Sequence, residues 1–202
     1  MSKGNIYIIS GPSGSGKDTI LKEVLKIRED VFFSISEITR DMRNGEVEGE
    51  KYHFISREEF KEKLANNYFL EYNEYSGNFY GTPKAPIEEH LAAGDDVVIE
   101  CDVNGAKALR KLLPDVISIF IMPPSFEVLQ KRLVGRATET TEQVERRMNE
   151  ALNEIRRADE YDYIVVNDDL SLAVEDFITV LKSNKLLLKN QKYLIDEVLK
   201  NA

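Results

Sequence analysis

The chain has 202 residues, of which 42% are hydrophobic and 31% charged, and its formal net charge is −9. This size and composition suit one well-buried α/β domain. An acidic surface disfavours nucleic acid and anionic membranes as partners. The single cysteine, Cys101, leaves no internal disulfide, and from the sequence we expect neither a signal peptide nor a transmembrane segment. We therefore expect a cytoplasmic protein.

The first element is predicted to be a buried strand, because residues 5–9 form a short apolar run with β-branched side chains. Residues 20–27 then place apolar side chains at helical spacing. Between them, residues 10–19 contain the pattern Gly-x-x-x-x-Gly-Lys. Backbone N–H groups of such a loop surround phosphate oxygens, the helix start adds its positive dipole end, and Lys17 can reach the β- and γ-phosphates of ATP.

A Gly-Ser turn without a ligand is the other interpretation of this segment. The strand before it, the helix after it and Lys17 favour the phosphate site. The one departure is Asp18, which stands where the pattern has Ser or Thr. The ATP-binding residues predicted in this loop are Gly11, Pro12, Ser13, Gly14, Ser15, Gly16, Lys17, Asp18 and Thr19.

Further along, residues 31–36 read as a second strand, and Ser56 begins a capping box for a helix. Residues 69–75 and 79–82 flank a turn and have the pattern of a hairpin. Because strands follow one another between about residues 38 and 80, we expect an antiparallel piece inserted beside the core. A short helix over 86–93 is predicted to end at Gly94.

After residue 96 the chain alternates strands and helices. The expected strands cover residues 97–102, 116–122 and 163–166, and helices are expected after each of them. This alternation predicts a parallel sheet with helices on both faces, whose ligands bind at the carboxyl ends of the strands. The residues expected to follow strands, and so to border one site, are Gly11, Ser36, Asp102, Pro123 and Asn167.

Two groups of basic residues have the composition of phosphate sites. Arg40 and Arg43 lie with Glu46 in a polar loop, and two arginines can grip a phosphate bidentately. The second group surrounds the polar loop 135–141, where a moving lid would exclude water during phosphoryl transfer. A solvated helix face is the other interpretation of that group. Its members are Lys131, Arg132, Arg136, Arg146 and Arg147.

Acidic residues end the strand predicted over 97–102. Glu100 and Asp102 are therefore candidate Mg²⁺ ligands, although capping of the following helix explains either one alone nearly as well. Asp18 is a third candidate ligand, because a carboxylate beside ATP phosphates is repelled unless a cation lies between them. We favour Mg²⁺ as that cation; in the alternative, Asp18 turns outward and pairs with a surface cation.

Taken together, these residues resemble the guanylate kinase family from about Ile6 to Leu181. The most specific motifs are Gly11–Lys17, Thr39–Phe54 with Arg40, Arg43 and Tyr52, Gly77–Gly81, Pro123–Ser125 and Val166–Asp169. The resemblance implies a P-loop NTPase-like parallel sheet flanked by helices, with an inserted mixed α/β GMP-binding subdomain and a short lid. It implies one domain, with a core of residues 1–35, 95–134 and 160–190, a GMP-binding insert of 36–94, a lid of 135–159 and a helical tail of 191–202.

The resemblance also implies residue roles. Lys17, Arg132, Arg136 and Arg147 are the implied catalytic residues on the ATP phosphates, and Asn167 lies near the adenine. Glu71 fits guanine, because its carboxylate can accept from N1–H and N2–H₂, which adenine does not present. The implied GMP-binding set is Ser36, Arg40, Arg43, Glu46, Tyr52, Glu71, Tyr80, Thr82 and Asp102. Four departures from the family pattern are Asp18, the pair Glu37-Ile38, Glu100 and Ala137.

The predicted function is therefore Mg²⁺-assisted transfer of a phosphoryl group from ATP to GMP or dGMP by a monomer or homodimer. Two alternatives stay open. One is a non-catalytic guanylate-kinase-like module that binds phosphoprotein, which would not need Lys17, Arg136 and Arg147. The other is a kinase of another phosphorylated small molecule, which would not need Glu71 together with Asp102.

Overall fold

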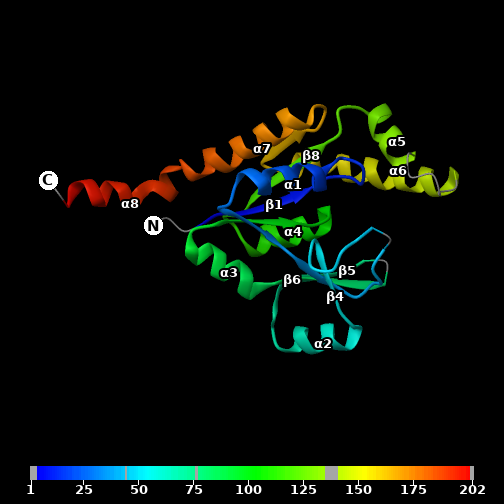
Figure 1. Ribbon diagram of the computed structural model, residues 1–202, viewed down its shortest axis with the longest axis horizontal. Coiled ribbons are helices and arrows are strands. Elements are labelled where there is room, and N and C mark those ends of the chain that lie inside the picture. The colour runs from blue at the N-terminus through cyan, green and yellow to red at the C-terminus, as the bar shows by residue number, and fades with distance from the viewer. Residues whose placement is uncertain (1–3, 44, 76, 135–140, 201–202) are drawn as a thin grey trace.

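The computed structural model describes residues 4–43, 45–75, 77–134 and 141–200, which form an α/β fold with two sheets (Figure 1). The strands are β1 (Ile6–Ser10), β2 (Val31–Ser34), β3 (Ser36–Ile38), β4 (Tyr52–Phe54), β5 (Phe69–Tyr75), β6 (Asn78–Pro83), β7 (Asp96–Glu100), β8 (Ile117–Met122) and β9 (Tyr163–Val166). The helices are α1 (Lys17–Ile27), α2 (Arg57–Ala65), α3 (Lys84–Ala93), α4 (Val103–Leu112), α5 (Phe126–Val134), α6 (Thr141–Ile155), the 3₁₀ turn η1 (Ala158–Glu160), α7 (Leu170–Lys185) and α8 (Leu188–Leu199).

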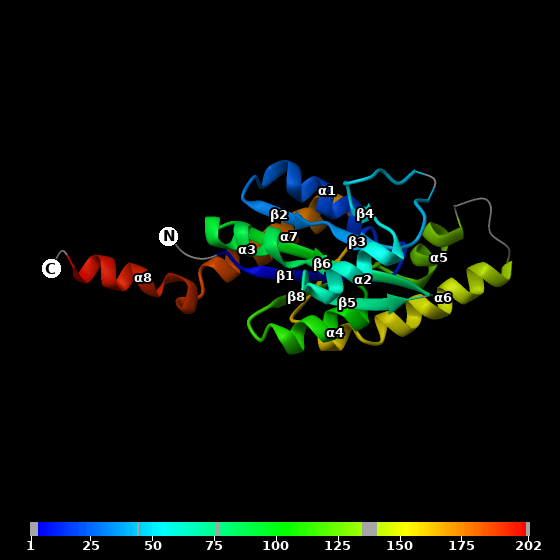
Figure 2. The same cartoon turned by 90° about the horizontal axis from the view of Figure 1, so that it is seen from below.

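The larger sheet is parallel, with the strand order β2-β7-β1-β8-β9. Side chains of its central strand alternate between the faces: Tyr7 and Ile9 pack with α1 and α7, and Ile8 packs with α3 and α4. Figure 2 shows α1 and α7 on one side of β1 and α4 on the other. The predicted parallel sheet flanked by helices is confirmed. It places the loop after β1 in the middle of the carboxyl edge, where such sheets bind ligands.

The smaller sheet has the order β4-β3-β6-β5 and corrects two predictions. The single strand expected over 31–36 is two strands in different sheets, because residues 31–34 bond to β7 whereas Ser36 opens β3. Ser36 therefore begins a strand instead of following one. The insert is also not purely antiparallel: β3 pairs with β6 antiparallel but with β4 in parallel. A period of two in the sequence identifies a strand but not its partners.

Several helix ends follow from local chemistry. The Ser56 side chain accepts from the Glu59 N–H at 3.0 Å, and Gly94 ends α3 with a φ of 96°, so both predicted caps are confirmed.

The C-terminal helix α8 extends away from the body of the molecule and buries none of its residues (Figure 1). Among the described residues, we find no helix with the length and apolar character needed to cross a membrane.

Candidate active site

The loop after β1 has the backbone that its glycines predict. Gly14 and Gly16 have φ angles of 84° and 88°, values that residues with a Cβ rarely adopt. A Cβ on Gly11 would lie 2.4 Å from the Ile121 carbonyl oxygen, and one on Gly16 would lie 2.1 Å from the side-chain nitrogen of Asn167. Glycine at these positions lets the loop curl tightly over the sheet edge, with α1 beginning at Lys17.

Lys17 folds back over this loop. Its Nζ donates to the carbonyl oxygens of Gly11 at 2.6 Å and Pro12 at 3.3 Å. The ammonium group is therefore held above the cradle, where phosphate oxygens would meet it. The Ser15 hydroxyl is buried and has no hydrogen-bond partner among the described residues, so its hydrogen-bonding capacity is unused within this loop.

The basic residues of α5 and α6 lie beside the same loop. Arg147 donates to the Ser13 hydroxyl at 2.9 Å, although 134 residues separate the two in the chain. Arg132 donates to the backbone oxygen of Asn167 at 3.0 Å. Arg136, the remaining member of the predicted catalytic set, and Ala137 lie outside the described residues. The structure thus brings Arg132 and Arg147 to the P-loop from one side.

The predicted GMP-phosphate residues gather on the smaller sheet. Both terminal nitrogens of the Arg40 guanidinium bond to the Glu46 carboxylate, and Arg40 also lies over the Tyr52 ring, 5.4 Å from its centroid. The bond from Arg40 lowers the pKa of Glu46 to about 2, and burial raises the pKa of Tyr52 to about 12. Arg43 is exposed, and its backbone N–H donates a hydrogen bond to Glu46 Oε2 at 2.7 Å. Glu46 therefore fixes Arg40 and leaves Arg43 on the surface of the loop.

The predicted guanine-reading residues come from neighbouring strands. The Thr82 hydroxyl on β6 donates to Glu71 Oε1 on β5 at 2.7 Å. Burial raises the pKa of Glu71, and the nearby charge of Asp102 raises it further. Asp102 is the N-cap of α4, where its Oδ1 accepts from the backbone N–H groups of Asn104 at 2.8 Å and Gly105 at 2.7 Å. Ser36 is 9% exposed, and Tyr80 lies on β6 beside β3.

The residues predicted to hold a metal are joined by a lysine that sequence analysis did not single out. Lys51 Nζ lies 2.6 Å from Asp18 Oδ1 and 3.0 Å from Glu100 Oε1. Glu100 ends β7 directly beside Ile9 of β1, two residues before the predicted strand end, because Asp102 already caps α4. The second Glu100 oxygen is buried without a hydrogen-bond partner in the described part of the chain. Within residues 4–43, 45–75, 77–134 and 141–200, no cluster of three or more metal-binding side chains occurs.

Asp18 therefore has a cation beside it, and that cation belongs to the protein. Desolvation works against the Asp18 carboxylate, but Lys51 outweighs it and lowers the pKa of Asp18. Only the unfavourable position of Asp18 signalled that such a cation was needed. The sequence around Lys51, an irregular loop 33 residues from Asp18, did not indicate which residue supplies it.

Glu154 is a second residue that sequence analysis missed. Burial raises its pKa to about 7, and among the charges that act on it are Lys17 and Asp102. A carboxyl group with this pKa can exchange a proton near neutral pH. The one signal in the sequence was its spacing of seven residues from Arg147, which places both on the same face of α6.

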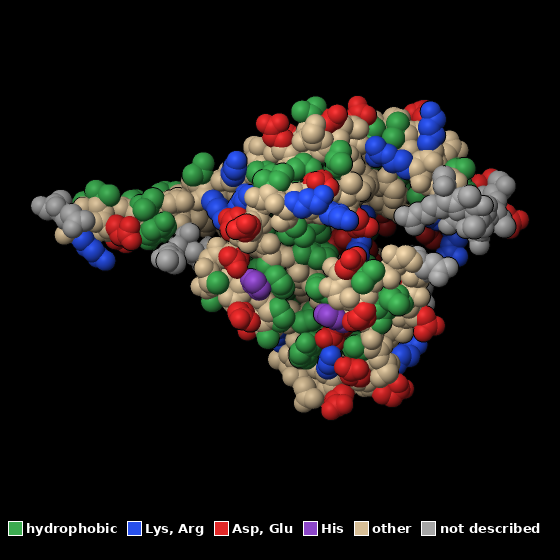
Figure 3. All heavy atoms as spheres, viewed as in Figure 1, with side chains coloured by type: hydrophobic (Ala, Val, Ile, Leu, Met, Phe, Trp, Pro, Cys, Tyr) green, Lys and Arg blue, Asp and Glu red, His purple; other side chains and the backbone are tan. Residues whose placement is uncertain are grey.

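Figure 3 shows the surface hollowed between the smaller sheet and the α5–α6 side, with acidic and basic side chains gathered around the hollow.

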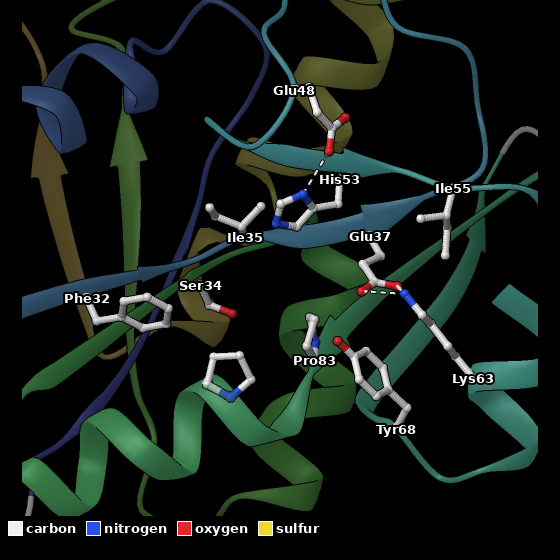
Figure 4. A pocket seen from close by; sticks show the side chains of 11 residues that line it. Phe32, Ser34, Ile35, Glu37, Glu48, His53, Ile55, Lys63, Tyr68 and Pro83 are labelled. Atoms are coloured by element: carbon white, nitrogen blue, oxygen red, sulfur yellow. Dashed lines mark hydrogen bonds and ion pairs between the residues drawn. The ribbon is translucent and has the colours of Figure 1, made fainter. Parts of the chain in front are cut away.

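A separate cavity of about 400 Å³ lies on the face of the smaller sheet opposite to Ser36 and Tyr52 (Figure 4). Neighbouring residues on a strand point to opposite faces, so Glu37 and His53 line this cavity while Ser36 and Tyr52 do not. The lining residues are Phe32, Ser34, Ile35, Glu37, Glu48, His53, Ile55, Lys63, Tyr68, Pro83 and Pro86. None of the predicted site residues is among them.

Comparison with known proteins assigns the family. The guanylate kinase family model matches residues 3–184. The chain is 45% identical to a guanylate kinase of Carboxydothermus hydrogenoformans, with 96% of each chain covered, and 47% identical to one of Hahella chejuensis, with 95% of this chain and 92% of the relative covered. A crystal structure of guanylate kinase from Anaplasma phagocytophilum superposes with a TM-score of 0.77 at 32% identity, covering 94% of this chain and 90% of that one. The resemblance seen in the motifs is confirmed, and this chain belongs to the guanylate kinase family of enzymes.

Proposed function

We propose that this protein transfers the γ-phosphoryl group of ATP to GMP, and to dGMP, with Mg²⁺. The observation that carries the choice of substrate is the Glu71–Thr82 pair. Thr82 occupies one oxygen of the half-buried Glu71 carboxylate and so leaves the other oxygen to accept from a ligand. A guanine base presents N1–H and N2–H₂ donors to such an acceptor, whereas adenine presents an acceptor at N1 and would leave the carboxylate unsatisfied.

The phosphate groups of the two substrates would meet between the two basic groups. Arg40, Arg43, Tyr52 and Tyr80 would hold the GMP phosphate, and Lys17, Arg132, Arg136 and Arg147 would neutralise the ATP phosphates. Phosphoryl transfer needs mainly positioning and charge neutralisation from the protein, which such a set provides. In this proposal Asn167 supports the P-loop through the Ser15 carbonyl, 2.7 Å from its amide nitrogen, besides lying near the adenine.

The residues present fit a Mg²⁺ ion that is bound mainly through ATP. Mg²⁺ in kinases typically keeps several waters and takes one or two carboxylates plus substrate phosphates. The Oε2 of Glu100 and the Ser15 hydroxyl are two buried oxygens beside the P-loop that have no hydrogen-bond partner among the described residues. When bound there, the ion would neutralise charge on the phosphates. Lys51 engages one oxygen of Asp18 and one of Glu100, and the cap of α4 engages one Asp102 oxygen. We favour Glu100 because its second oxygen is buried without a hydrogen-bond partner among the described residues.

The setting proposed for this reaction is the cytoplasm, with GMP and ATP as small-molecule partners. The formal charge of −9 supports the further prediction that nucleic acid is not a partner. That the protein is a monomer or a homodimer stays a prediction.

The test is a coupled ADP-release assay with GMP, dGMP, AMP, CMP and UMP as acceptors. Sites that bind a substrate through buried hydrogen bonds reject analogues lacking them by up to about 10⁴–10⁵-fold, so AMP should be turned over scarcely at all. Glu71→Gln should weaken GMP binding, because a carboxylate oxygen that accepts hydrogen bonds is replaced by an amide NH₂ that faces the guanine N1–H or N2–H₂ donors. Glu74→Gln is the matched control, since Glu74 lies on the same strand and is 55% exposed. Comparable kcat/KM for AMP and GMP would overturn the proposed substrate.

A further inference from the structure

Lys51 connects three separate elements of the molecule. It lies in the loop just before β4, Asp18 lies in the first turn of α1, and Glu100 ends β7. The lysine therefore belongs to the insert, whereas both of its carboxylate partners belong to the core. Its distances to them, 2.6 Å and 3.0 Å, are those of charge-assisted hydrogen bonds.

This bridge is more than an exposed ion pair. The Lys51 side chain is 31% exposed and that of Glu100 12%, so water screens their interaction only partly, whereas Asp18 is 70% exposed and its bond to Lys51 is screened more. Burial opposes the charge of Lys51, but Glu100 and, more weakly, Asp18 outweigh it and raise the pKa of the ammonium group. Lys51 is therefore charged throughout the neutral range, and its single positive charge is shared between two acidic groups that lie beside the ATP cradle.

The bridge also lies next to the residues of the insert that are proposed to hold the GMP phosphate. Lys51 directly precedes Tyr52, whose ring centroid lies 5.6 Å from the lysine Nζ and 5.4 Å from the Arg40 guanidinium carbon. Tyr52 pairs with Ser36 in the smaller sheet. Where Lys51 is anchored to the core, Tyr52 and Arg40 are held at a set distance from the P-loop.

We propose that Lys51 is a positioning residue that latches the insert to the P-loop helix and sets the approach of the acceptor phosphate to the ATP phosphates. This inference rests on the proposed function for its catalytic consequence, but not for the latch itself. A latch of this kind acts through Asp18 and Glu100 and need not touch either substrate.

The kinetic test compares Lys51→Met with Lys63→Met. Lys63 is a matched control, because it also bridges two carboxylates, Glu37 at 2.9 Å and Glu59 at 3.0 Å, and is 27% exposed, but both partners lie within the insert. Since small misplacements of reacting groups cost up to about 100-fold, we expect Lys51→Met to lower kcat by on the order of 10-fold or more, and Lys63→Met by less than about 2-fold. Lys51→Arg, which keeps the charge, should recover most of the loss. Equal effects of the two methionine variants would overturn the proposal.

A second test needs no substrate. Amide hydrogen exchange of the peptide covering residues 49–55 reports how often this loop leaves the core. Exchange should be faster in Lys51→Met and in Asp18→Asn than in the unmodified protein, and Lys51→Met should add little once Asp18 and Glu100 are both replaced by their amides. Raising the salt concentration should speed exchange in the unmodified protein more than in Lys51→Met. Exchange that is unchanged in every variant would overturn the latch.

The two tests separate the latch from the proposed function. If the unmodified protein turned over no GMP while the exchange rates changed as expected, the latch would stand and the proposed function would fail. If GMP were turned over well but neither kcat nor exchange responded to Lys51→Met, the function would stand and the latch would fail.

Discussion

The side-chain amide of Asn167 donates to the backbone oxygen of Ser15 at 2.7 Å, so the loop after β9 supports the P-loop from 152 residues away. Asn167 is itself held at both ends of its backbone, since its N–H donates to the Met122 carbonyl and its own carbonyl accepts from Arg132. The close fit of its amide against Gly16 explains why a Cβ could not be accommodated there. One residue thus ties the last core strand, the P-loop and α5 together.

Asn167→Ala should therefore loosen the P-loop. The Ser15 carbonyl would lose a buried partner, which costs about 1–3 kcal/mol of stability, and KM for ATP should rise more than KM for GMP. Asn184→Ala is the control, because Asn184 is also buried and its amide donates to a backbone carbonyl, that of Val180, far from the P-loop. Urea unfolding and steady-state kinetics measure both effects. Equal rises in the KM for ATP in the two variants would contradict this role of Asn167.

The two arginine groups should separate in kinetics. Arg40→Ala should mainly raise KM for GMP, through loss of a charge-assisted contact worth about 1.5–3 kcal/mol. Arg147→Ala should mainly lower kcat, because the charge it meets develops on the transferring phosphoryl group. Arg146→Ala is the control for α6, since that neighbouring side chain is 75% exposed and pairs with Glu150. Should Arg147→Ala change only the KM for GMP, the assignment of α6 to the ATP side is wrong.

The Mg²⁺ dependence of Asp18 variants distinguishes the two roles considered for this carboxylate. Lys51 already neutralises Asp18 in the structure, so Asp18→Gly should shift the Mg²⁺ concentration for half-maximal rate by less than about 2-fold, as expected for a group outside the metal shell. Titrating Mg²⁺ at fixed ATP in both proteins makes the comparison. A clear rise in that concentration, with tighter metal-free ATP binding, would instead support Asp18 as a metal ligand.

Glu154 should make stability depend on pH above neutrality. Its pKa is raised from 4.5 to about 7, so the folded protein binds this proton more tightly than the unfolded chain does. The stabilising contribution is complete below pH 4.5 and is lost as the pH rises through about 7.

Glu154→Gln should remove this loss of stability at high pH, because glutamine carries no titratable group. The variant should be more stable than the unmodified protein at pH 8 by at most about 3 kcal/mol, because one pKa unit corresponds to about 1.4 kcal/mol and partial exposure lowers the figure. The difference should vanish near pH 4.5. Denaturant unfolding at the two pH values tests this, and Glu145→Gln, an exposed glutamate on the same helix, is the control. A gain in stability that is the same at both pH values would point to packing instead of titration.

The sequence by itself determined those features that depend on a few neighbouring residues. The P-loop could be located because only glycine adopts the backbone of Gly14 and Gly16 readily, and its flanking strand and helix have different periods. The caps at Ser56 and Gly94 follow from equally local chemistry. The order of spaced motifs was enough to identify the family. These signals survive in the sequence because each is completed within a few positions of the chain.

Only the tertiary structure decided which distant residues meet. The break between β2 and β3 depends on hydrogen bonds to β7 on one side and to β6 on the other, and no local pattern encodes that choice. The partner of Asp18 is likewise 33 residues away, and the third member of that bridge lies 49 residues from Lys51. An ion pair depends on the distance between two charges in space, and that distance is set by how the two sheets pack. The position of Asp18 in the sequence could therefore indicate that a cation lies nearby, but not which residue supplies it.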